Sequence, residues 1–280
     1  MTLQQSNVHW ARPDDERSTG TGVVVVAGSS GRLAAGRADM LAGHGVTALA
    51  LRWFGGEGQP GVPCEIPLET FIEANDLLAA ECDRVVLMGH SYGAEAALLT
   101  ATFDQRVDAV VALAPTDVAW EGQHGHDDDS RRSKWTYQGD PIPFVPLDRA
   151  WQPPSSMPAF VECYEHSRAL VDADVVEAAT IPVDRIAGDL VLVVGGDDKV
   201  WPSGAAARHI AACRDRAGLG TVVIEDHRAG HPIVLPGEVP PDLNRPYQVD
   251  GDEGGPQRLG ELAWPAIRRV LRLAADREPT

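Results

Sequence analysis

Short apolar runs recur along the chain, and segments with helical spacing separate most of them. Each run is rich in β-branched residues and lacks the polar alternation of a half-exposed strand, which predicts strands buried on both faces. The expected strands are Val23–Ala27, Val46–Leu51, Arg84–Met88, Val107–Leu113, Leu190–Val194 and Thr221–Ile224. The expected helices are Leu33–Ala42, Leu68–Ala80, Ala94–Phe103, Gly204–Arg216 and Pro256–Ala275.

Alternation of buried strands with helices predicts a doubly wound α/β fold, with a mostly parallel sheet and helices on both faces. Ligands of such sheets bind at the carboxyl ends of the strands. A chain of 280 residues has the length of one such domain, so we expect residues 1–280 to form a single unit.

One long segment, 116–187, interrupts this alternation between the fourth and fifth expected strands. It is polar over Glu121–Lys134, proline-rich from Asp140 to Pro158, and regains helical spacing over Ala159–Ala179. Long insertions at the carboxyl ends of strands usually carry function. We therefore expect this insertion to be a lid that shapes substrate access.

Composition narrows the class of protein. Hydrophobic residues make up 44% of the chain, yet no window approaches the ~18 uninterrupted apolar residues of a membrane span, so no membrane partner is expected. A net charge of −17 argues against nucleic acid as a partner. The N-terminal segment lacks the apolar core of a secretory signal, and the four cysteines lie far apart without a CxxC pair. We expect a cytoplasmic location and no metal or other cofactor, while oligomeric state stays open.

The segment Gly89-His90-Ser91-Tyr92-Gly93 is a Gly-x-Ser-x-Gly motif between an expected strand and an expected helix. This context is typical of a nucleophile elbow, in which a tight turn exposes the serine above the sheet. The glycines leave room for a strained backbone at the serine. Ser91 is therefore the predicted nucleophile, and His90 is expected to pack against or orient its neighbours.

A nucleophilic serine needs a base and an orienting acid, and in this fold the chain order is serine, acid, histidine. Asp198 follows the fifth expected strand and is the predicted acid, with the adjacent Asp197 as the alternative. His231 follows the last expected strand and is the predicted base, with His227 as its rival.

An oxyanion hole needs two N–H donors aimed at the developing charge. The backbone of Tyr92, directly after the nucleophile, is expected to supply one. The second is expected from the glycine- and serine-rich loop after the first strand, at Ser29 or, failing that, Ser30. A phosphate-binding loop is the alternative for this segment, but the GxxxxGK[ST] spacing is absent.

Several longer segments resemble one family, the C-terminal domain of acyl-CoA thioesterases and bile-acid-CoA:amino-acid N-acyltransferases, a relative of dienelactone hydrolase. The similarity runs from Val23 to about Pro236. It is carried by Ala27-Gly28-Ser29-Ser30-Gly31, Leu51-Arg52-Trp53-Phe54-Gly55, Ile66-Pro67-Leu68-Glu69-Thr70-Phe71, Gly93-Ala94-Glu95, Trp135-Thr136-Tyr137, Ile142-Pro143-Phe144-Val145-Pro146, Ile181-Pro182-Val183 and Gly195-Gly196-Asp197-Asp198-Lys199-Val200-Trp201-Pro202-Ser203.

This resemblance implies an α/β-hydrolase fold and chemistry on an acyl thioester, carried either by CoA or by a carrier protein. Transferring members tend to use cysteine where this chain has Ser91, so the resemblance implies a thioesterase more than an acyltransferase. Three alternatives stay open: a carboxylesterase or lactone hydrolase of the dienelactone hydrolase type, an acyltransferase to an amine or alcohol, and a binding protein without activity.

The acidic chain raises the question of how it would bind the phosphates of CoA. Arg131, Arg132 and Lys134 form a basic cluster in the insertion, next to Trp135, and these four residues are the candidate substrate contacts. The alternative is simple pairing of the cluster with Asp127–Asp129.

Overall fold

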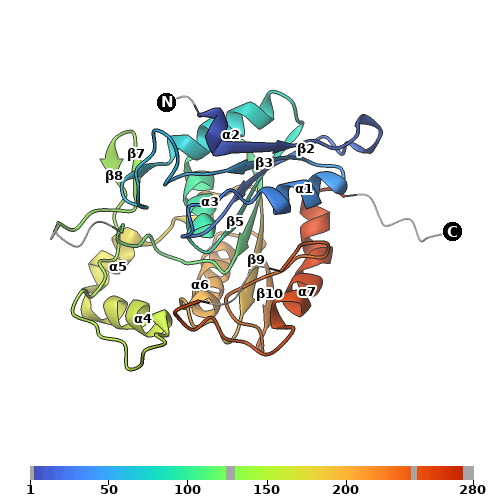
Figure 1. The fold of residues 1–280 in the computed structure, drawn as a ribbon. Helices are drawn as coiled ribbons and strands as arrows, with labels where there is room; N and C mark the ends of the chain where they lie inside the picture. Colours follow the sequence, from blue (N-terminus) through green and yellow to red (C-terminus); the bar gives the residue numbers. More distant parts are fainter. Residues whose placement is uncertain (1–2, 124–129, 241–244, 274–280) are drawn as a thin grey trace.

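A seven-stranded sheet forms the centre of the protein in this computed structural model, which describes residues 3–123, 130–240 and 245–273 (Figure 1). The strand order is β1-β3-β2-β5-β6-β9-β10, and every pairing is parallel except that of β1 with β3. The strands are β1 (Val8–Ala11), β2 (Thr21–Val26), β3 (Thr47–Leu51), β5 (Arg84–His90), β6 (Val107–Leu113), β9 (Asp189–Gly195) and β10 (Val222–Asp226).

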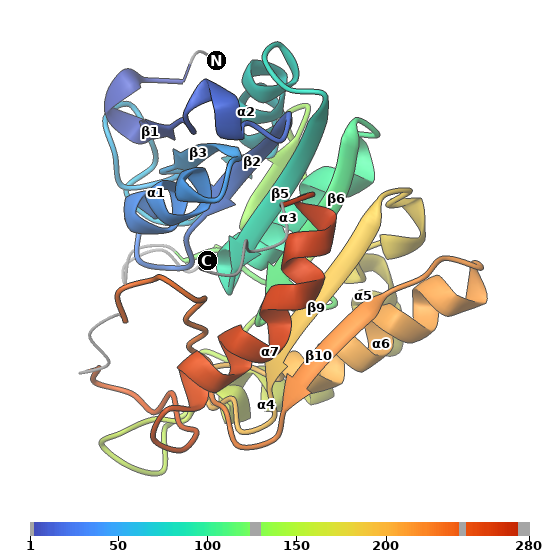
Figure 2. The same cartoon turned by 90° about the vertical axis from the view of Figure 1, so that its right-hand side faces the viewer.

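Helices cover both faces of this sheet, which explains why its inner strands are apolar throughout (Figure 2). One buried cluster joins the sheet to α2, α3 and α6, and the other joins it to α1 and α7. The helices of the two layers are α1 (Ala35–Gly43), α2 (Glu69–Ala79), α3 (Tyr92–Phe103), α6 (Ser203–Arg216) and α7 (Gly255–Val270). None of the helices in the described part of the chain is long and apolar enough to cross a bilayer.

The six predicted strands and the predicted helices are confirmed, with ends shifted by a few residues. The additional strand β1 was not predicted. It is an edge strand of only four residues, Val-His-Trp-Ala, with a single fully buried position, so its sequence shows no buried apolar run. Short turns of 3-10 helix flank it at η1 (Gln5–Asn7) and η2 (Asp15–Arg17).

The described part of the segment between β6 and β9 packs against the rest of the protein, including α3, β4 and α6. Its strand β7 (Trp135–Tyr137) pairs with β4 (Ile66–Pro67) and with β8 (Asp140–Pro141) in a small second sheet. The helical spacing over 159–179 corresponds to two helices, α4 (Phe160–Leu170) and α5 (Ala173–Ala179), followed by η3 (Val183–Arg185). Trp120 and Trp135 are almost wholly buried, so this segment contributes to the main core.

Candidate active site

Ser91 lies in the sharp turn between β5 and α3. Its backbone has φ 57° and ψ −123°, which is a strained conformation for a residue with a side chain, and Tyr92 begins the helix directly after it. The register of β2 on β5 ends at Val26 opposite Gly89, so the loop after β2 continues alongside Ser91. A strained serine at the carboxyl edge of a parallel sheet has the geometry of a nucleophile elbow.

The two glycines of the motif are required by close backbone contacts. A Cβ on Gly89 would lie 1.9 Å from the carbonyl oxygen of Gly93, and a Cβ on Gly93 would lie 2.5 Å from the carbonyl oxygen of Val26. Both distances are far below van der Waals contact. The motif therefore requires glycine at both positions, because the turn packs closely against itself and against β2.

Asp198 and His231 form a buried pair at the ends of β9 and β10. The Nδ1 of His231 is 2.9 Å from the Oδ2 of Asp198, and both side chains are less than 10% exposed. Because a carboxylate only accepts, Nδ1 carries the proton and Nε2 is left as the basic nitrogen. The register Asp226↔Gly195 brings the two loops side by side, which explains why residues 33 positions apart meet.

Further donors fix the carboxylate of Asp198. The hydroxyl of Ser203 donates to Oδ2 at 2.7 Å, and the amides of Val200 and Trp201 donate to Oδ1 at 2.8 and 3.2 Å. Burial raises the pKa of Asp198, but His231 and these hydrogen bonds lower it more, so the net pKa lies below its ordinary value. Asp198 is therefore an ionised, oriented acid. Ser203 was not singled out from the sequence.

The alternatives left open by the sequence occupy different positions. Asp197 is 41% exposed and its carboxylate pairs with Lys199 at 2.8 Å. His227 is 87% exposed, with its Nδ1 3.4 Å from Glu225. Among the described residues, no side-chain hydrogen bond joins Asp197 to His227, whereas one joins Asp198 to His231.

His90 links the nucleophile turn to the loop that carries His231. Its Nε2 is 3.1 Å from the carbonyl oxygen of His231, and the two rings lie edge to face with centroids 4.9 Å apart. Since a carbonyl only accepts, Nε2 of His90 carries a proton. Loss of solvent and the neighbouring His231 lower the pKa of His90 to about 3. His90 is thus a neutral orienting residue, as predicted from its place in the motif.

This lowered pKa makes folding pH-dependent. Below the ordinary pKa of 6.5 the unfolded chain binds a proton at His90 that the folded protein does not bind, so stability falls as pH drops. Between pH 7.5 and pH 5 we expect this residue to cost about 2 kcal/mol of unfolding free energy. Urea unfolding of the wild type and of His90→Asn at both pH values measures it. Equal losses in the two proteins would contradict the assignment.

A cavity of about 580 Å³ contains Ser91 and His231 together. Its described lining comes from residues 26–37, from residues 231–239 and 245–249, and from His90 and Ser91. Gly28 packs directly against Ser91, because a Cβ on Gly28 would lie 3.1 Å from the Cβ of Ser91. The volume of this cavity lies within the range of small-molecule binding sites.

The predicted oxyanion donors come from two segments, the loop after β2 and the first turn of α3. Ser29 and Ser30 line the cavity beside Ser91. Tyr92 is the first residue of α3, where backbone N–H groups have no acceptor within the helix. The side chain of Tyr92 points elsewhere: its hydroxyl is 2.8 Å from that of Tyr164.

The predicted lid does not form the walls of this cavity. Among the described residues that line it, none belongs to the insertion 116–187. The insertion instead supports the stretch that does, since the ring of Phe160 is 5.6 Å from that of Tyr247 and the amide of Gln248 donates to Pro158. Residues 231–239 and 245–249 were not predicted from the sequence as part of the cavity wall, because they show no strand or helix periodicity.

The structure does not support the prediction that Arg131, Arg132, Lys134 and Trp135 contact the substrate. Lys134 and Trp135 are fully buried and both donate to Glu95, so neither can reach a phosphate in the cavity. Arg131 pairs with Glu121 at 2.7 Å, and Arg132 pairs with Glu65 at 2.9 Å. The alternative partners, Asp127–Asp129, lie outside the described residues. A charge pattern along the chain does not show whether a lysine finds a buried partner.

Glu95 is the centre of a polar network under the nucleophile turn. It accepts from the Nζ of Lys134 at 2.6 Å, the indole of Trp135 at 2.7 Å and the amide of Trp120 at 3.0 Å. The ammonium of Lys134 also lies 3.5 Å from the ring centroid of Tyr92. This network ties the insertion to the first turn of α3, where the predicted oxyanion donor lies.

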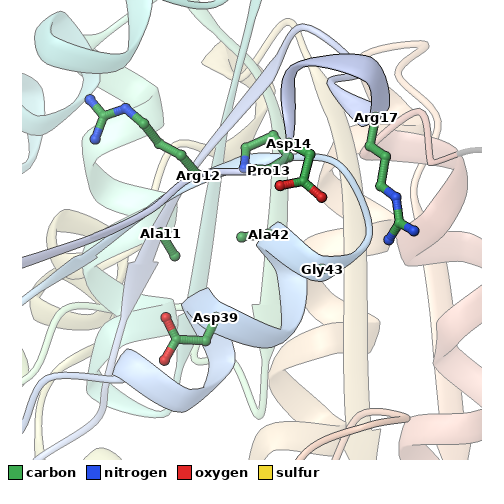
Figure 3. Close-up of a pocket in the computed structure, with 8 residues that line it drawn as sticks. All are labelled: Ala11, Arg12, Pro13, Asp14, Arg17, Asp39, Ala42 and Gly43. Atoms are coloured by element: carbon green, nitrogen blue, oxygen red, sulfur yellow. The ribbon is translucent and has the colours of Figure 1, made fainter.

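A second cavity, of about 400 Å³, lies between the end of β1 and the C-terminal half of α1 (Figure 3). The side chains of Arg12 and Arg17 point away from each other there. Arg12 pairs with Glu81 and Asp39 pairs with His9, so these charges are already compensated. Its lining contains no histidine, serine or cysteine. Elsewhere in the described ranges, no three His, Cys, Asp or Glu side chains are grouped to hold a metal ion.

The fold is that of the α/β-hydrolases. Thermogutta terrifontis esterase 2 shares it with a TM-score of 0.57 and 16% identity, over 97% of this chain and 90% of that one. A Klebsiella pneumoniae protein assigned to the dienelactone hydrolases shares it with a TM-score of 0.55 and 13% identity, over 95% of this chain and 92% of that one.

A family model, BAAT / Acyl-CoA thioester hydrolase C terminal, matches residues 66–240, and the chain belongs to this family. The resemblance inferred from the sequence is confirmed. Acyl-coenzyme A amino acid N-acyltransferase 1 of Mus musculus is 25% identical over 90% of this chain and 59% of its own length. Acyl-coenzyme A thioesterase 6 of Homo sapiens is 28% identical over 65% of this chain and 41% of its own. The chain therefore spans only part of the length of these relatives.

Proposed function

We propose that the protein hydrolyses an acyl thioester through an acyl-serine intermediate on Ser91. The observation that carries this proposal is the buried His231–Asp198 pair opening onto the same cavity as a strained, elbow-type Ser91. Membership of the family adds the substrate class, because its relatives are named for acyl-CoA chemistry. The proposed triad is Ser91, Asp198 and His231.

In the first half-reaction the Nε2 of His231 takes the proton of Ser91 as its Oγ attacks the thioester carbonyl. Asp198 holds the imidazole tautomer and stabilises the imidazolium. The amides of Tyr92 and Ser29 stabilise the tetrahedral oxyanion, at about 3 kcal/mol for each donor. Collapse of this intermediate expels the thiolate, which takes the proton from His231.

In the second half-reaction His231 removes a proton from water, which attacks the acyl-serine carbonyl. The bond between the acyl carbon and the Oγ of Ser91 then breaks, His231 returns its proton to this Oγ, and the carboxylic acid is released. A serine nucleophile at this position favours hydrolysis over transfer, as expected from the sequence. Acyl transfer to an amine is the second candidate, because the mouse relatives are named as amino acid N-acyltransferases.

The charged side chains that line the cavity bear on how an acidic protein binds an anionic substrate. The lining of the cavity carries three guanidinium groups and one carboxylate. Arg37 is paired with Glu238 through two hydrogen bonds, whereas Arg32 and Arg245 pair with no carboxylate among the described residues. We assign to these two arginines the role that the sequence had given to the cluster 131–134, contact with the anionic carrier.

Replacing Arg32 and Arg245 by alanine together is expected to raise the KM for acyl-CoA about tenfold and to leave the KM for a p-nitrophenyl ester unchanged, since the ester carries no phosphate. The double variant Arg131→Ala/Arg132→Ala is the matched control and should leave both values unchanged. An equal rise for both substrates would remove the arginines from phosphate recognition.

Thiol release from acyl-CoA thioesters of graded chain length, measured beside p-nitrophenyl esters, tests the function itself. Turnover of one thioester class supports a thioesterase and defines the acyl group. Ester turnover alone moves the assignment to a carboxylesterase. Addition of glycine, taurine or an alcohol, with conjugates detected by mass, identifies an acyltransferase. A carrier-bound substrate is tested by the same assay with an acylated carrier protein.

Two expectations from the sequence, on domain organisation and on cellular location, remain proposals. Residues 1–280 form one domain, in which the insertion 116–187 acts as a lid that shapes substrate access through its contacts with Tyr247 and Gln248. The protein resides in the cytoplasm, a location supported by four free cysteines in the described structure.

A further inference from the structure

A second nucleophile–base pair lies on α6, outside the cavity of Ser91. His209 and Cys213 are four residues apart, so they share one face of the helix. The Sγ of Cys213 is 3.4 Å from the Nε2 of His209. Both side chains are partly exposed, and α6 lies on the face of the sheet opposite α7 (Figure 2).

His209 is oriented by a carboxylate from a distant part of the chain. Its Nδ1 is 2.6 Å from the Oδ2 of Asp117, which is 5% exposed. Two hydrogen bonds from Arg168, at 2.7 and 2.9 Å, fix this carboxylate. Because Asp117 accepts, Nδ1 carries the proton and the lone pair of Nε2 faces the thiol of Cys213. Cys213, His209 and Asp117 are thus arranged in the order nucleophile, base and orienting acid.

A positively charged side chain also contacts the sulfur of Cys213. The Nη2 of Arg216, one turn further along, donates to the Sγ of Cys213 at 3.1 Å. A guanidinium beside the sulfur stabilises a thiolate once the proton has moved to His209. The described residues thus supply both a proton acceptor and a positive charge at this cysteine.

From these contacts we propose that Cys213 is a modification site for low-molecular-weight disulfides. His209 takes the thiol proton, and the Cys213 thiolate attacks one sulfur of the disulfide. A new S–S bond to Cys213 forms as the old one breaks. The leaving thiolate takes the proton from His209 and departs as a thiol, so no further oxidant is needed.

The other cysteines differ from Cys213 in their burial or in the pKa of their thiols. Cys64 is buried. Burial raises the pKa of Cys82 and of Cys163, which disfavours their thiolates. They are internal controls for selective reaction at Cys213.

The test follows each cysteine by peptide mass after exposure to oxidised glutathione, in the native protein and in the urea-unfolded chain. Exposure alone can only bring a native thiol up to the unfolded rate, whereas activation takes it beyond that rate. Cys213 is expected to react about tenfold faster in the native protein than in the unfolded chain. Cys82 and Cys163 are expected to react more slowly when native.

Substitution at the base separates activation from exposure. His209→Gln, which keeps a helix-compatible side chain, should reduce the native rate at Cys213 to the unfolded rate or below. His9→Ala removes a comparable surface His–Asp pair, with a 2.7 Å contact to Asp39, and should leave Cys213 unchanged. Ser91→Ala should also leave it unchanged, so this result is independent of the proposed hydrolysis. A native rate at or below the unfolded rate, or no effect of His209→Gln, would overturn the proposal.

Discussion

Ser91→Ala is expected to lower the kcat for the proposed acyl-thioester hydrolysis by about 10⁵-fold while the protein stays folded. The change removes one oxygen atom from a side chain that is 5% exposed, and the strained turn keeps its two glycines. No acyl-enzyme can form without the Oγ, so only substrate binding and the oxyanion donors remain. Thiol release measured on the purified variant, with circular dichroism as the check on folding, gives the result.

Substitutions at the two neighbouring aspartates provide the matched control. Asp198→Asn should lower kcat by about 10⁴-fold, because an amide no longer enforces the proton on Nδ1 of His231. Asp197→Asn removes a half-exposed partner of Lys199 and should change kcat less than twofold. Similar losses in the two variants, or full activity of Ser91→Ala, would contradict the proposed triad.

Lys134→Met destabilises the protein by about 3–5 kcal/mol, because it leaves the carboxylate of Glu95 buried without its cation. Neither Lys134 nor Glu95 is exposed to solvent at all. Urea unfolding measures the loss. The matched control is Arg132→Met, which breaks a pair with Glu65 whose side chains are 37% and 45% exposed, and it should cost less than about 1 kcal/mol.

The paired variant Lys134→Met/Glu95→Gln tests the cause of this loss. Removing both charges should recover part of the stability, since no isolated charge stays buried. A loss for Lys134→Met no larger than that for Arg132→Met would mean that Glu95 does not depend on its partner. The network would then not be what holds the insertion onto α3.

The sheet and the catalytic candidates could be predicted from sequence because their signals are local. The apolar run of β5, the motif around Ser91 and the helix after it are contiguous. Asp198 and His231 follow their strands, and the parallel order of the sheet brings these strand ends to one edge. The sequence already favoured Asp198 over Asp197, and the structure adds the hydrogen bond between Asp198 and His231 that supports this preference.

The cavity walls and the buried charges could not be predicted, because they depend on pairings between distant segments. Lys134 was taken as a surface cation, yet its partner Glu95 lies 39 positions away on α3. The stretch 231–249 has no periodicity that indicates a cover. The spacing of His209 and Cys213 is visible in the sequence, but Asp117 comes from another loop 92 positions before His209.

The most direct test of the proposed mechanism is the mass of the protein quenched in acid during its first turnover of an acyl-CoA. A transient acyl adduct is expected on the peptide that contains Ser91. It should appear together with the free thiol and decay as the carboxylic acid is released. Ser91→Ala should show no adduct and no thiol release. Thioester turnover without an adduct on Ser91, and undiminished in Ser91→Ala, would contradict the acyl-serine mechanism.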